Sequence, residues 1–411
     1  MKYLIIGCGP AGMHAAYKLD ELDKNAEITL INSESNLPYS RILITFLLEK
    51  KVEEEDLFIF SEEFLQKDNI NYYQNKSVEE IDSDNKKVKL NDGTALNYDK
   101  LLIAAGGDPK RPSVKGIESD RIFTIRTIDD IKTVKAKMET AEKCAVLGGG
   151  LVSLKMAQAL KRQGIGIKVL IRSPRVLSQV LDEESAVLIA DHLEENGIEL
   201  LTGTQIEEIV EEKKGLVFNT NKGKISSDFA VIGKGVSPNM DFLDKTSVKT
   251  DWGILSDEYL QTEEKDIFAA GDVVENYNIA QDSIQLNSIW PDAVLQGITA
   301  AENMAGKFKK YPGNINMNAV DIFSLPLIAM GRVKDVENLE TVKYENKAEK
   351  KFVKLFFNND LLVGAVLIND VENAGFYKQL IAKRKIIKDR ETLLNKNNLL
   401  ANYIFWKEVT E

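Results

Sequence analysis

The chain opens with Met1-Lys-Tyr-Leu-Ile-Ile-Gly7-Cys-Gly9-Pro-Ala-Gly12, an apolar run that leads directly into a cluster of glycines. Residues 13–22 carry apolar side chains at helical spacing and 27–31 form a second apolar run, so the stretch predicts a β-α-β unit. Gly7 permits a tight turn, Gly9 lacks the side chain that would block a diphosphate, and Gly12 lets the helix pack closely on the strand. Because the helix N-terminus also offers free N–H groups to an anion, the stretch predicts a dinucleotide site. A glycine turn without a ligand is the alternative.

A second copy of this pattern begins at Cys144. There Cys144-Ala-Val-Leu-Gly148-Gly149-Gly150-Leu-Val-Ser153 again joins an apolar strand to a glycine turn, and 166–171 predicts the strand after its helix. A helix at 183–196, a strand at 198–201 and the stretch 229–235 complete this unit. Two dinucleotide motifs imply two dinucleotides, and because no low-complexity linker separates the parts, we expect the second unit to be inserted within the first.

The remaining segments predict strands and helices around these two units. Residues 86–92 predict a strand and turn in a small antiparallel excursion, and 98–107 predict a buried strand ending in small residues, which let a backbone approach a flat group. An apolar strand within 262–272 ends on a glycine and a carboxylate, and a helix starts at Trp290-Pro291. Beyond Pro312 the runs 352–357 and 361–368 predict a hairpin, followed by a lysine-rich helical tail.

Length and composition narrow the classes of function. A chain of 411 residues suits two or three domains, and its net charge of −11 argues against a nucleic-acid partner while permitting a basic redox protein. Only Cys8 and Cys144 occur, which excludes a disulfide scaffold, a four-cysteine zinc site and a cysteine-ligated iron–sulfur cluster. We expect no metal site and a reducing cytoplasm. No apolar run reaches membrane-spanning length, and the N-terminus does not resemble a signal sequence.

Four motifs together resemble the pyridine nucleotide–disulfide oxidoreductase superfamily, the two-dinucleotide-binding-domain flavoproteins. They are GxGxxG at Gly7, YDxLLIAxG at 98–106, the triple glycine at Gly148 and TxxxxIFAAGD at 262–272. Residues 38–43 resemble a loop of nitrite reductase large subunits, rubredoxin reductases and the FAD/NAD oxidoreductases found with carbon monoxide dehydrogenase. Residues 289–297 and 311–320 are especially similar to the last of these groups.

The resemblance implies an α/β fold with two Rossmann-like domains, one inserted in the other, and a C-terminal α+β domain. It places an FAD domain at 1–110 and 241–310, an NAD(P) domain at 111–240, and an interface domain with a helical tail at 311–411. The helix at Trp290 would point its positive end at the flavin, where the reduced ring carries negative charge. The residues that the resemblance places at FAD are Gly7, Gly9, Pro10, Ala11, Gly12, Asn32, Glu34, Arg41, Val78, Ala104, Ala105, Gly106, Arg126, Gly271, Asp272, Trp290 and Pro291. Those that it places at NAD or NADP are Gly148, Gly149, Gly150, Leu151, Val152, Ser153, Arg172, Gly233 and Gly235.

Some of these positions depart from the family pattern. For the adenosine hydroxyls of FAD, either Asn32 or Glu34 is available, Glu34 being the better charged acceptor. Arg172 stands where the family has a glutamate for the NAD ribose, so NADP is allowed, although an arginine can also stack on adenine and accept NAD. Ser153 replaces a glycine, and it is small enough to keep the helix close.

The region around the flavin departs as well. It has no cysteine between 38 and 48, where disulfide reductases carry a pair. Ferredoxin reductases pair a lysine here with a glutamate in the second glycine motif, and this chain has Phe46 and Lys155 instead. We expect Lys155 to be a lone ammonium near the nicotinamide, with Arg41 as a second catalytic candidate. A surface role for Lys155 is the alternative.

We therefore expect an FAD enzyme that exchanges a hydride with NAD(P)H and passes electrons to a ferredoxin- or rubredoxin-like protein, or to a metalloenzyme subunit. We expect no other chemical step, because the sequence shows two nucleotide sites but no thiol, metal or acid–base pair that could carry one out. An oxygen-reducing NAD(P)H oxidase and a flavin-binding scaffold subunit are the alternatives. A homodimer or a place in a larger complex is possible, and the sequence identifies neither the acceptor nor the direction of electron flow.

Overall fold

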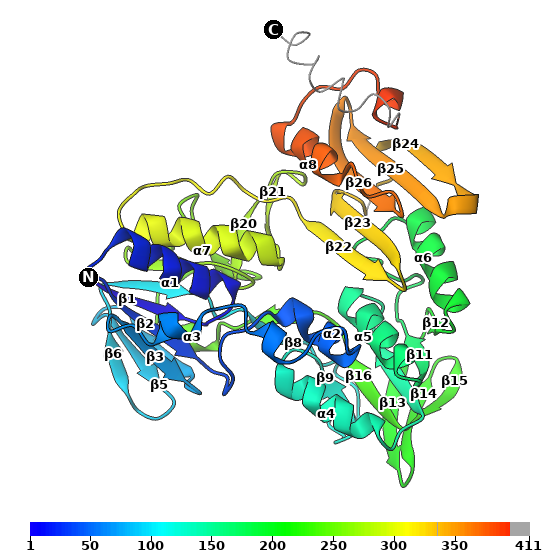
Figure 1. Cartoon of the computed structure of the whole chain (residues 1–411), viewed down its shortest axis with the longest axis horizontal. Coiled ribbons are helices and arrows are strands. Elements are labelled where there is room, and N and C mark those ends of the chain that lie inside the picture. Colours follow the sequence, from blue (N-terminus) through cyan, green and yellow to red (C-terminus); the bar gives the residue numbers. More distant parts are fainter. Residues whose placement is uncertain (335, 395–411) are drawn as a thin grey trace. The chain divides into compact units, whose positions relative to one another are not determined.

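The computed structural model describes residues 1–334 and 336–394, which form two compact units (Figure 1). The first unit comprises Met1–Arg172, Ile198–Tyr277 and Ile284–Asn314. The second comprises Ser173–Gly197, Asn278–Ser283 and the described residues between Ile315 and Leu394. Among the residues that the structure describes, no helix has both the length and the apolar character needed to cross a bilayer.

The first unit contains two five-stranded sheets in which every pairing is parallel. Because both faces of a parallel sheet are covered, its strands are apolar throughout, as the fully buried residues 3–6 of β1 illustrate. The first sheet has the order β19 (Ile267–Ala269), β7 (Lys100–Ile103), β1 (Lys2–Ile6), β2 (Glu27–Asn32) and β3 (Ile70–Gln74). The second has the order β12 (Glu199–Leu201), β11 (Gly166–Leu170), β10 (Lys143–Leu147), β16 (Phe229–Ile232) and β9 (Ile122–Thr124).

Since β9 to β16 all lie between β7 and β19 in the chain, the second sheet is inserted within the first, as predicted. The assignment of the two sheets to separate FAD and NAD(P) domains at the expected boundaries stays a prediction. The predicted antiparallel excursion is present as β4 (Val78–Asp82), β5 (Lys87–Leu90) and β6 (Ala95–Asn97). A second one is formed by β13 (Ile206–Glu212), β14 (Gly215–Thr220) and β15 (Gly223–Ser227).

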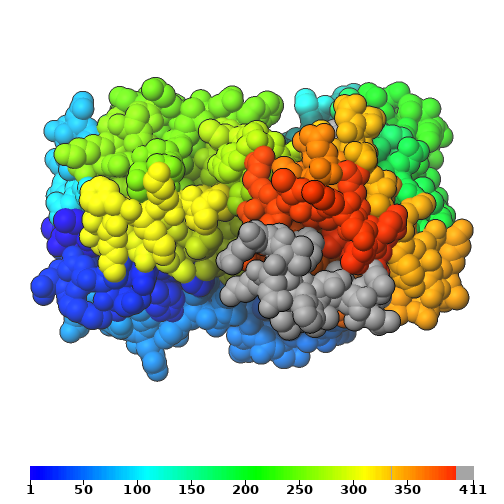
Figure 2. Space-filling view, turned by 90° about the horizontal axis from the view of Figure 1, so that it is seen from above, coloured from blue at the N-terminus to red at the C-terminus, as the bar shows by residue number. Residues whose placement is uncertain are grey.

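Helices cover the parallel sheets. Helices α1 (Pro10–Leu22) and α7 (Trp290–Met304) lie side by side on the first sheet, shown dark blue and yellow in Figures 1 and 2. They pack so closely that a Cβ on Gly297 would lie 2.1 Å from the carbonyl oxygen of Ala11. Helix α5 (Leu151–Arg162) packs on the second sheet, and the other helices are α2 (Ile44–Leu48), α3 (Glu62–Leu65) and α4 (Ile128–Met138). Shorter elements are η1 (Arg41–Leu43), η2 (Glu55–Leu57), η3 (Asp241–Leu243), β8 (Gly107–Pro109), β17 (Val236–Pro238), β18 (Ile254–Leu255), β20 (Val274–Asn278) and β21 (Ser283–Leu286).

The second unit is built on an antiparallel sheet. Its order is β22 (Met317–Ile322), β23 (Leu325–Gly331), β26 (Leu361–Ile368), β25 (Lys351–Asn358) and β24 (Glu340–Asn346). The predicted hairpin joins β25 to β26 through a two-residue loop, in which Asn359 has a positive φ of 54°. Helix α8 (Ala374–Lys383) follows, with η4 (Lys347–Glu349) and η5 (Glu391–Leu394). The remainder of the predicted lysine-rich tail, 395–411, lies outside the described residues.

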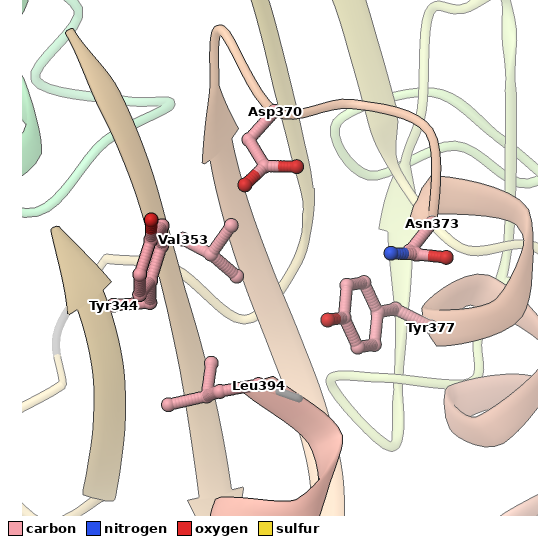
Figure 3. A pocket seen from close by; sticks show the side chains of 6 residues that line it. All are labelled: Tyr344, Val353, Asp370, Asn373, Tyr377 and Leu394. Atoms are coloured by element: carbon pink, nitrogen blue, oxygen red, sulfur yellow. The ribbon is translucent and has the colours of Figure 1, made fainter. Parts of the chain in front are cut away.

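A small hollow in the second unit is lined by Tyr344, Val353, Asp370, Asn373, Tyr377 and Leu394 (Figure 3). The hydroxyl of Tyr377 donates a hydrogen bond to the carbonyl oxygen of Leu393 at 2.8 Å, and burial raises the pKa of Tyr377. These contacts belong to the packing of α8 and η5 on the sheet.

Helix α6 (Glu183–Glu195), which we expected to complete the second nucleotide unit, packs with the C-terminal sheet instead. Asp182 precedes α6 and accepts a hydrogen bond from the buried Nζ of Lys354 on β25 at 2.6 Å. His192 approaches the carbonyl oxygen of Ile322 at 3.1 Å. Polar contacts that the linear pattern does not reveal therefore hold this helix on the second unit.

Candidate active site

In the first glycine turn, two glycines are packed tightly against backbone atoms and a third faces open space. Gly7 has φ of +101°, and a Cβ there would lie 2.2 Å from the carbonyl oxygen of Ala104. A Cβ on Gly12 would lie 1.9 Å from the carbonyl oxygen of Gly7. At Gly9, by contrast, a Cβ would meet nothing within 4 Å, and no side chain caps the helix that begins at Pro10. The turn thus presents an open, uncapped helix N-terminus, which fits the diphosphate of a dinucleotide.

The ends of two further strands lie beside this turn. After β7, the small residues Ala104, Ala105 and Gly106 pass behind Gly7. After β19, the N–H of Gly271 donates a hydrogen bond to Gln296 Oε1 at 2.7 Å, and a Cβ on Gly271 would lie 3.2 Å from the Cβ of Ala11. The sequence placed all of these residues at one cofactor, and the fold brings them to one edge of the sheet.

Glu34 lies in a polar cluster with two residues of the following loop. Arg41 forms an ion pair with Glu34 Oε1, and the hydroxyl of Tyr39 donates a hydrogen bond to Glu34 Oε2 at 2.7 Å. The Tyr39 hydroxyl also accepts a hydrogen bond from the N–H of Ile128 at 3.2 Å. Burial, followed by the nearby Glu34 carboxylate, raises the pKa of Tyr39 despite the Arg41 cation. Sequence analysis missed Tyr39, whose only signal was its place between Pro38 and Arg41.

The cluster continues to the other predicted arginine. Arg41 Nη1 donates a hydrogen bond to the carbonyl oxygen of Arg126 at 3.1 Å, and Arg126 Nη2 lies 3.4 Å from Asp272 Oδ2. Arg126 also lies beside Gly106, where a Cβ would be 3.4 Å from its Nη2. The structure therefore connects four predicted residues in one polar chain. The contacts of Arg41 are those of a residue that positions its neighbours, and its catalytic role stays a prediction.

Asn32 and Glu34 differ in what they can still bind. The amide nitrogen of Asn32 donates hydrogen bonds to the carbonyl oxygen of Asn36 and the hydroxyl of Tyr72, both at 2.8 Å. Both amide hydrogens of Asn32 are thus used within the protein, and its contact with FAD stays a prediction. The Glu34 carboxylate retains acceptor capacity because each of its oxygens has two lone pairs. Glu34 is therefore the better candidate for a ribose.

The start of α7 carries a negative charge that we had not considered. Asp292 lies in the first turn, is buried, and accepts a hydrogen bond from Asn287. A carboxylate at a helix N-terminus opposes the positive end of the helix dipole. That this helix faces the flavin stays a prediction, and a carboxylate at its start would offset part of the positive potential that the motif suggested. Trp290 packs against the core of the first sheet, as does Val78, at the start of β4, from the sheet's other face.

The second glycine turn likewise has one tightly packed glycine and one that faces open space. Gly148 has φ of +127°, and a Cβ there would lie 2.7 Å from the carbonyl oxygen of Gly233. Ser153 Oγ donates a hydrogen bond to that oxygen at 2.8 Å, so the serine fastens the turn to the strand end. At Gly150 a Cβ would meet only that oxygen, at 4.0 Å. Val152, one residue after Leu151 in the first turn of α5, is 47% exposed, and the turn therefore has room for a second dinucleotide.

Our expectation of a lone ammonium at Lys155 is wrong. Lys155 Nζ lies 3.4 Å from Glu49 Oε1, and the Glu49 side chain is 0% exposed. Glu49 also accepts a hydrogen bond from Gln158 at 3.0 Å and forms ion pairs with Arg162 at 2.5 Å and Lys51 at 2.8 Å. Burial opposes ionisation of Glu49, but the hydrogen bond from Lys51 and the surrounding cations hold its pKa below the usual value. A buried carboxylate bound by several cations is thus fixed between α2 and α5.

This cluster had a signal in the sequence. Lys155, Gln158 and Arg162 follow helical spacing, so they share one face of a helix that is otherwise mostly apolar. Glu49 stands three residues after Phe46, and Lys155 Nζ lies 4.9 Å from the Phe46 ring centroid. An ion pair therefore joins the segment after Phe46 to the helix of the second glycine motif, with the acid on the first and the base on the second.

Comparison with known proteins identifies the family. Residues 1–297 match the model of the pyridine nucleotide-disulphide oxidoreductases, and 317–385 match that of the rubredoxin NAD+ reductase C-terminal domain. The chain belongs to the pyridine nucleotide-disulphide oxidoreductase family. The predicted fold class, the dependence on FAD and a nicotinamide nucleotide, and the oxidoreductase activity are thereby confirmed. The roles of individual residues stay predictions.

Three similar proteins illustrate the range of this family. The epsilon subunit of the NADH-dependent phenylglyoxylate dehydrogenase of Aromatoleum evansii is 27% identical over 93% of this chain and 92% of its own. The NADH-rubredoxin oxidoreductase of Clostridium acetobutylicum is 29% identical over 93% and 95%. The structure of an engineered water-forming NADPH oxidase, derived from the Lactobacillus brevis enzyme and bound to NADPH, is 25% identical with a TM-score of 0.89, covering 94% and 92%.

The two open glycines give a paired test of the two nucleotide sites. Gly9→Val should yield folded protein without flavin, because valine fits the extended backbone at φ of −74° but fills the diphosphate space. Gly150→Val should keep FAD and lose reduction by NAD(P)H. Flavin absorbance and circular dichroism of each variant provide the control for the other. Normal flavin content in Gly9→Val would refute this use of the first turn.

The Glu49 cluster predicts opposite shifts of the flavin potential. Lys155→Met removes a cation and should lower it by roughly 20–65 mV, if the charge lies about 5 Å from the ring at an effective dielectric of about 20–60. Glu49→Gln removes the anion and should raise it. Redox titration with measured FAD content tests both, and Lys161→Met on the same helix is the control. If the flavin potentials of the variants and the native protein agree within about 10 mV, the cluster lies too far from the flavin to affect its potential.

Proposed function

We propose that this protein moves electrons from a nicotinamide nucleotide through FAD directly to a redox protein or a metal-containing partner subunit. Bound FAD supplies the conversion between two-electron and one-electron transfer. The residues of the chain hold the two nucleotides at separate glycine turns and set the charge around them. The name of one relative, an NADH-rubredoxin oxidoreductase, supports a redox-protein acceptor, and that of another, a dehydrogenase subunit, supports work with partner subunits.

The positions of the two thiols carry this proposal. Cys8 is buried inside the first glycine turn, where its Sγ lies 3.7 Å from the carbonyl oxygen of Ile31, and burial raises its pKa strongly. Cys144 is buried in β10, and its pKa is raised for the same reason. A thiol attacks as thiolate, so neither residue is suited to a disulfide step. Electrons must then leave the flavin without passing through a cysteine. Two buried free thiols also accord with our proposal of a reducing, cytoplasmic location.

A cysteine-free variant tests this route. Cys8→Ala with Cys144→Ala should retain NAD(P)H-dependent reduction of a one-electron acceptor such as rubredoxin or ferricyanide within about twofold, with normal FAD content. Loss of acceptor reduction while NAD(P)H still reduces the flavin would show that a thiol takes part. Oxygen consumption as fast without the acceptor as with it would favour the oxidase alternative. Flavin that binds but is not reduced by either nucleotide would favour the scaffold alternative.

We also propose that the nucleotide is NADPH. Arg172 follows β11 by two residues, at the strand end where an acid would bind an NAD ribose, and Ile171 and Ser173 flank it. The substitutions named for the engineered NADPH oxidase replace an aspartate by alanine and place an arginine and then a serine directly after it. Here Arg172 takes the place of the acid itself, whereas the engineered arginine stands one residue after it; in both chains the acid is absent and an arginine lies at or beside its position.

Arg172→Glu tests the choice of nucleotide. If Arg172 pairs with the 2′-phosphate, the variant should bind NADPH more weakly by about 1.5–3 kcal/mol, the range of a charge-assisted hydrogen bond, and NADH much less so. Dissociation constants from flavin-loaded protein provide the measurement. Equal losses for both nucleotides would mean that Arg172 contacts a part that they share, such as adenine.

A further inference from the structure

We propose that Lys234 acts with Arg172 as a second determinant of nucleotide specificity, and that the two cations together bind the 2′-phosphate on the adenosine ribose. Lys234 was not among the residues that the motifs suggested. The inference rests on the proposed use of NADPH.

The sheet places both residues at the same edge, on either side of the second glycine turn. Strand β10, which ends in this turn, pairs with β11 through Leu147 and Leu170, and with β16 through Leu147 and Ile232. Arg172 and Lys234 each lie two residues beyond those partners. Neighbouring strands are about 4.8 Å apart, so only one strand width on each side separates the two backbones from the turn. Two long cationic side chains therefore flank the place where the nucleotide lies.

The backbone that carries Lys234 is fixed on both sides. The N–H of Gly233 donates a hydrogen bond to the carbonyl oxygen of Leu147 at 3.1 Å, and its own carbonyl accepts one from Ser153. The carbonyl oxygen of Gly235 accepts a hydrogen bond from the N–H of Lys110 at 2.9 Å. A side chain on so constrained a segment returns to the same region each time, as a binding residue requires.

The charges around Arg172 and Lys234 are unbalanced. Among residues 1–334 and 336–394, no carboxylate forms an ion pair or hydrogen bond with either side chain. Partial desolvation and the neighbouring Arg172 cation lower the pKa of Lys234, so the two positive charges oppose each other even though both residues are exposed to solvent. Many of the other lysines in the described part of the chain are instead paired with carboxylates, as Lys155 is with Glu49. An anion between Arg172 and Lys234 would remove the repulsion, and a phosphate has the charge and the oxygen acceptors to bind both.

Calorimetry with nucleotide fragments tests the assignment on flavin-loaded protein. Adenosine 2′,5′-bisphosphate and AMP differ only in the 2′-phosphate, and neither can transfer a hydride, so the readout does not depend on activity. Lys234→Gln should weaken binding of the bisphosphate about 5- to 30-fold and change AMP less than twofold. Lys234→Arg should retain most of the preference, and Lys234→Gln with Arg172→Gln should abolish it. Lys224→Gln, at an exposed lysine on β15, is the control.

Three other outcomes would contradict the inference about Lys234 or the proposal of NADPH. Equal losses for AMP and the bisphosphate would show that Lys234 binds the 5′-phosphate, and would overturn the inference. An unchanged preference in Lys234→Gln would overturn it as well, while leaving the NADPH proposal intact. A native protein that binds the two fragments equally would refute the NADPH proposal and with it the 2′-phosphate site. The transfer of electrons to a redox protein would stand in all three cases, because its test uses a different measurement.

Discussion

Both nucleotide turns depend on backbone touching backbone. At Gly7 and Gly12 in the first turn, and at Gly148 in the second, an added Cβ would lie between 1.9 and 2.7 Å from a carbonyl oxygen. These contacts allow no side chain, and they bring each helix start against its strand ends. Gly9 and Gly150 make no such contacts and face open space, because the close contacts between helix and strands are made by the neighbouring glycines. A single motif therefore contains glycines with two different physical functions.

The second constraint is electrostatic. Glu49 has no exposed side-chain surface, and leaving its charge unpaired there would cost several kcal/mol. Its cationic partners lie on α5 and beside α2, so the pairing ties the segment after the first nucleotide motif to the helix of the second. The chain from Glu34 through Arg41 and Arg126 to Asp272 makes a similar connection within the same unit. Charge thus links parts of the site that lie far apart in sequence.

The same balance of charges bears on chemistry. Asp292 sets a carboxylate at the start of α7, whereas no carboxylate of the described residues pairs with Arg172 or Lys234 at the second turn. The two turns therefore differ in the charges around them. With both thiols buried, the chain offers the flavin an electrostatic environment but no further redox group of its own among the described residues.

The sequence by itself determined the two β-α-β units, the insertion of one in the other, the C-terminal hairpin and most of the residues at the turns. These features depend on local periodicity and on glycines, whose conformational role is visible in the linear pattern. Only the tertiary structure decided the charges. Glu49 and Lys155 are more than 100 residues apart, Asp182 and Lys354 more than 170, and the pairing of such residues follows from packing that no local pattern encodes. For the same reason the sequence could name Arg172 but not Lys234, since their proximity arises from two strands that meet only through a third.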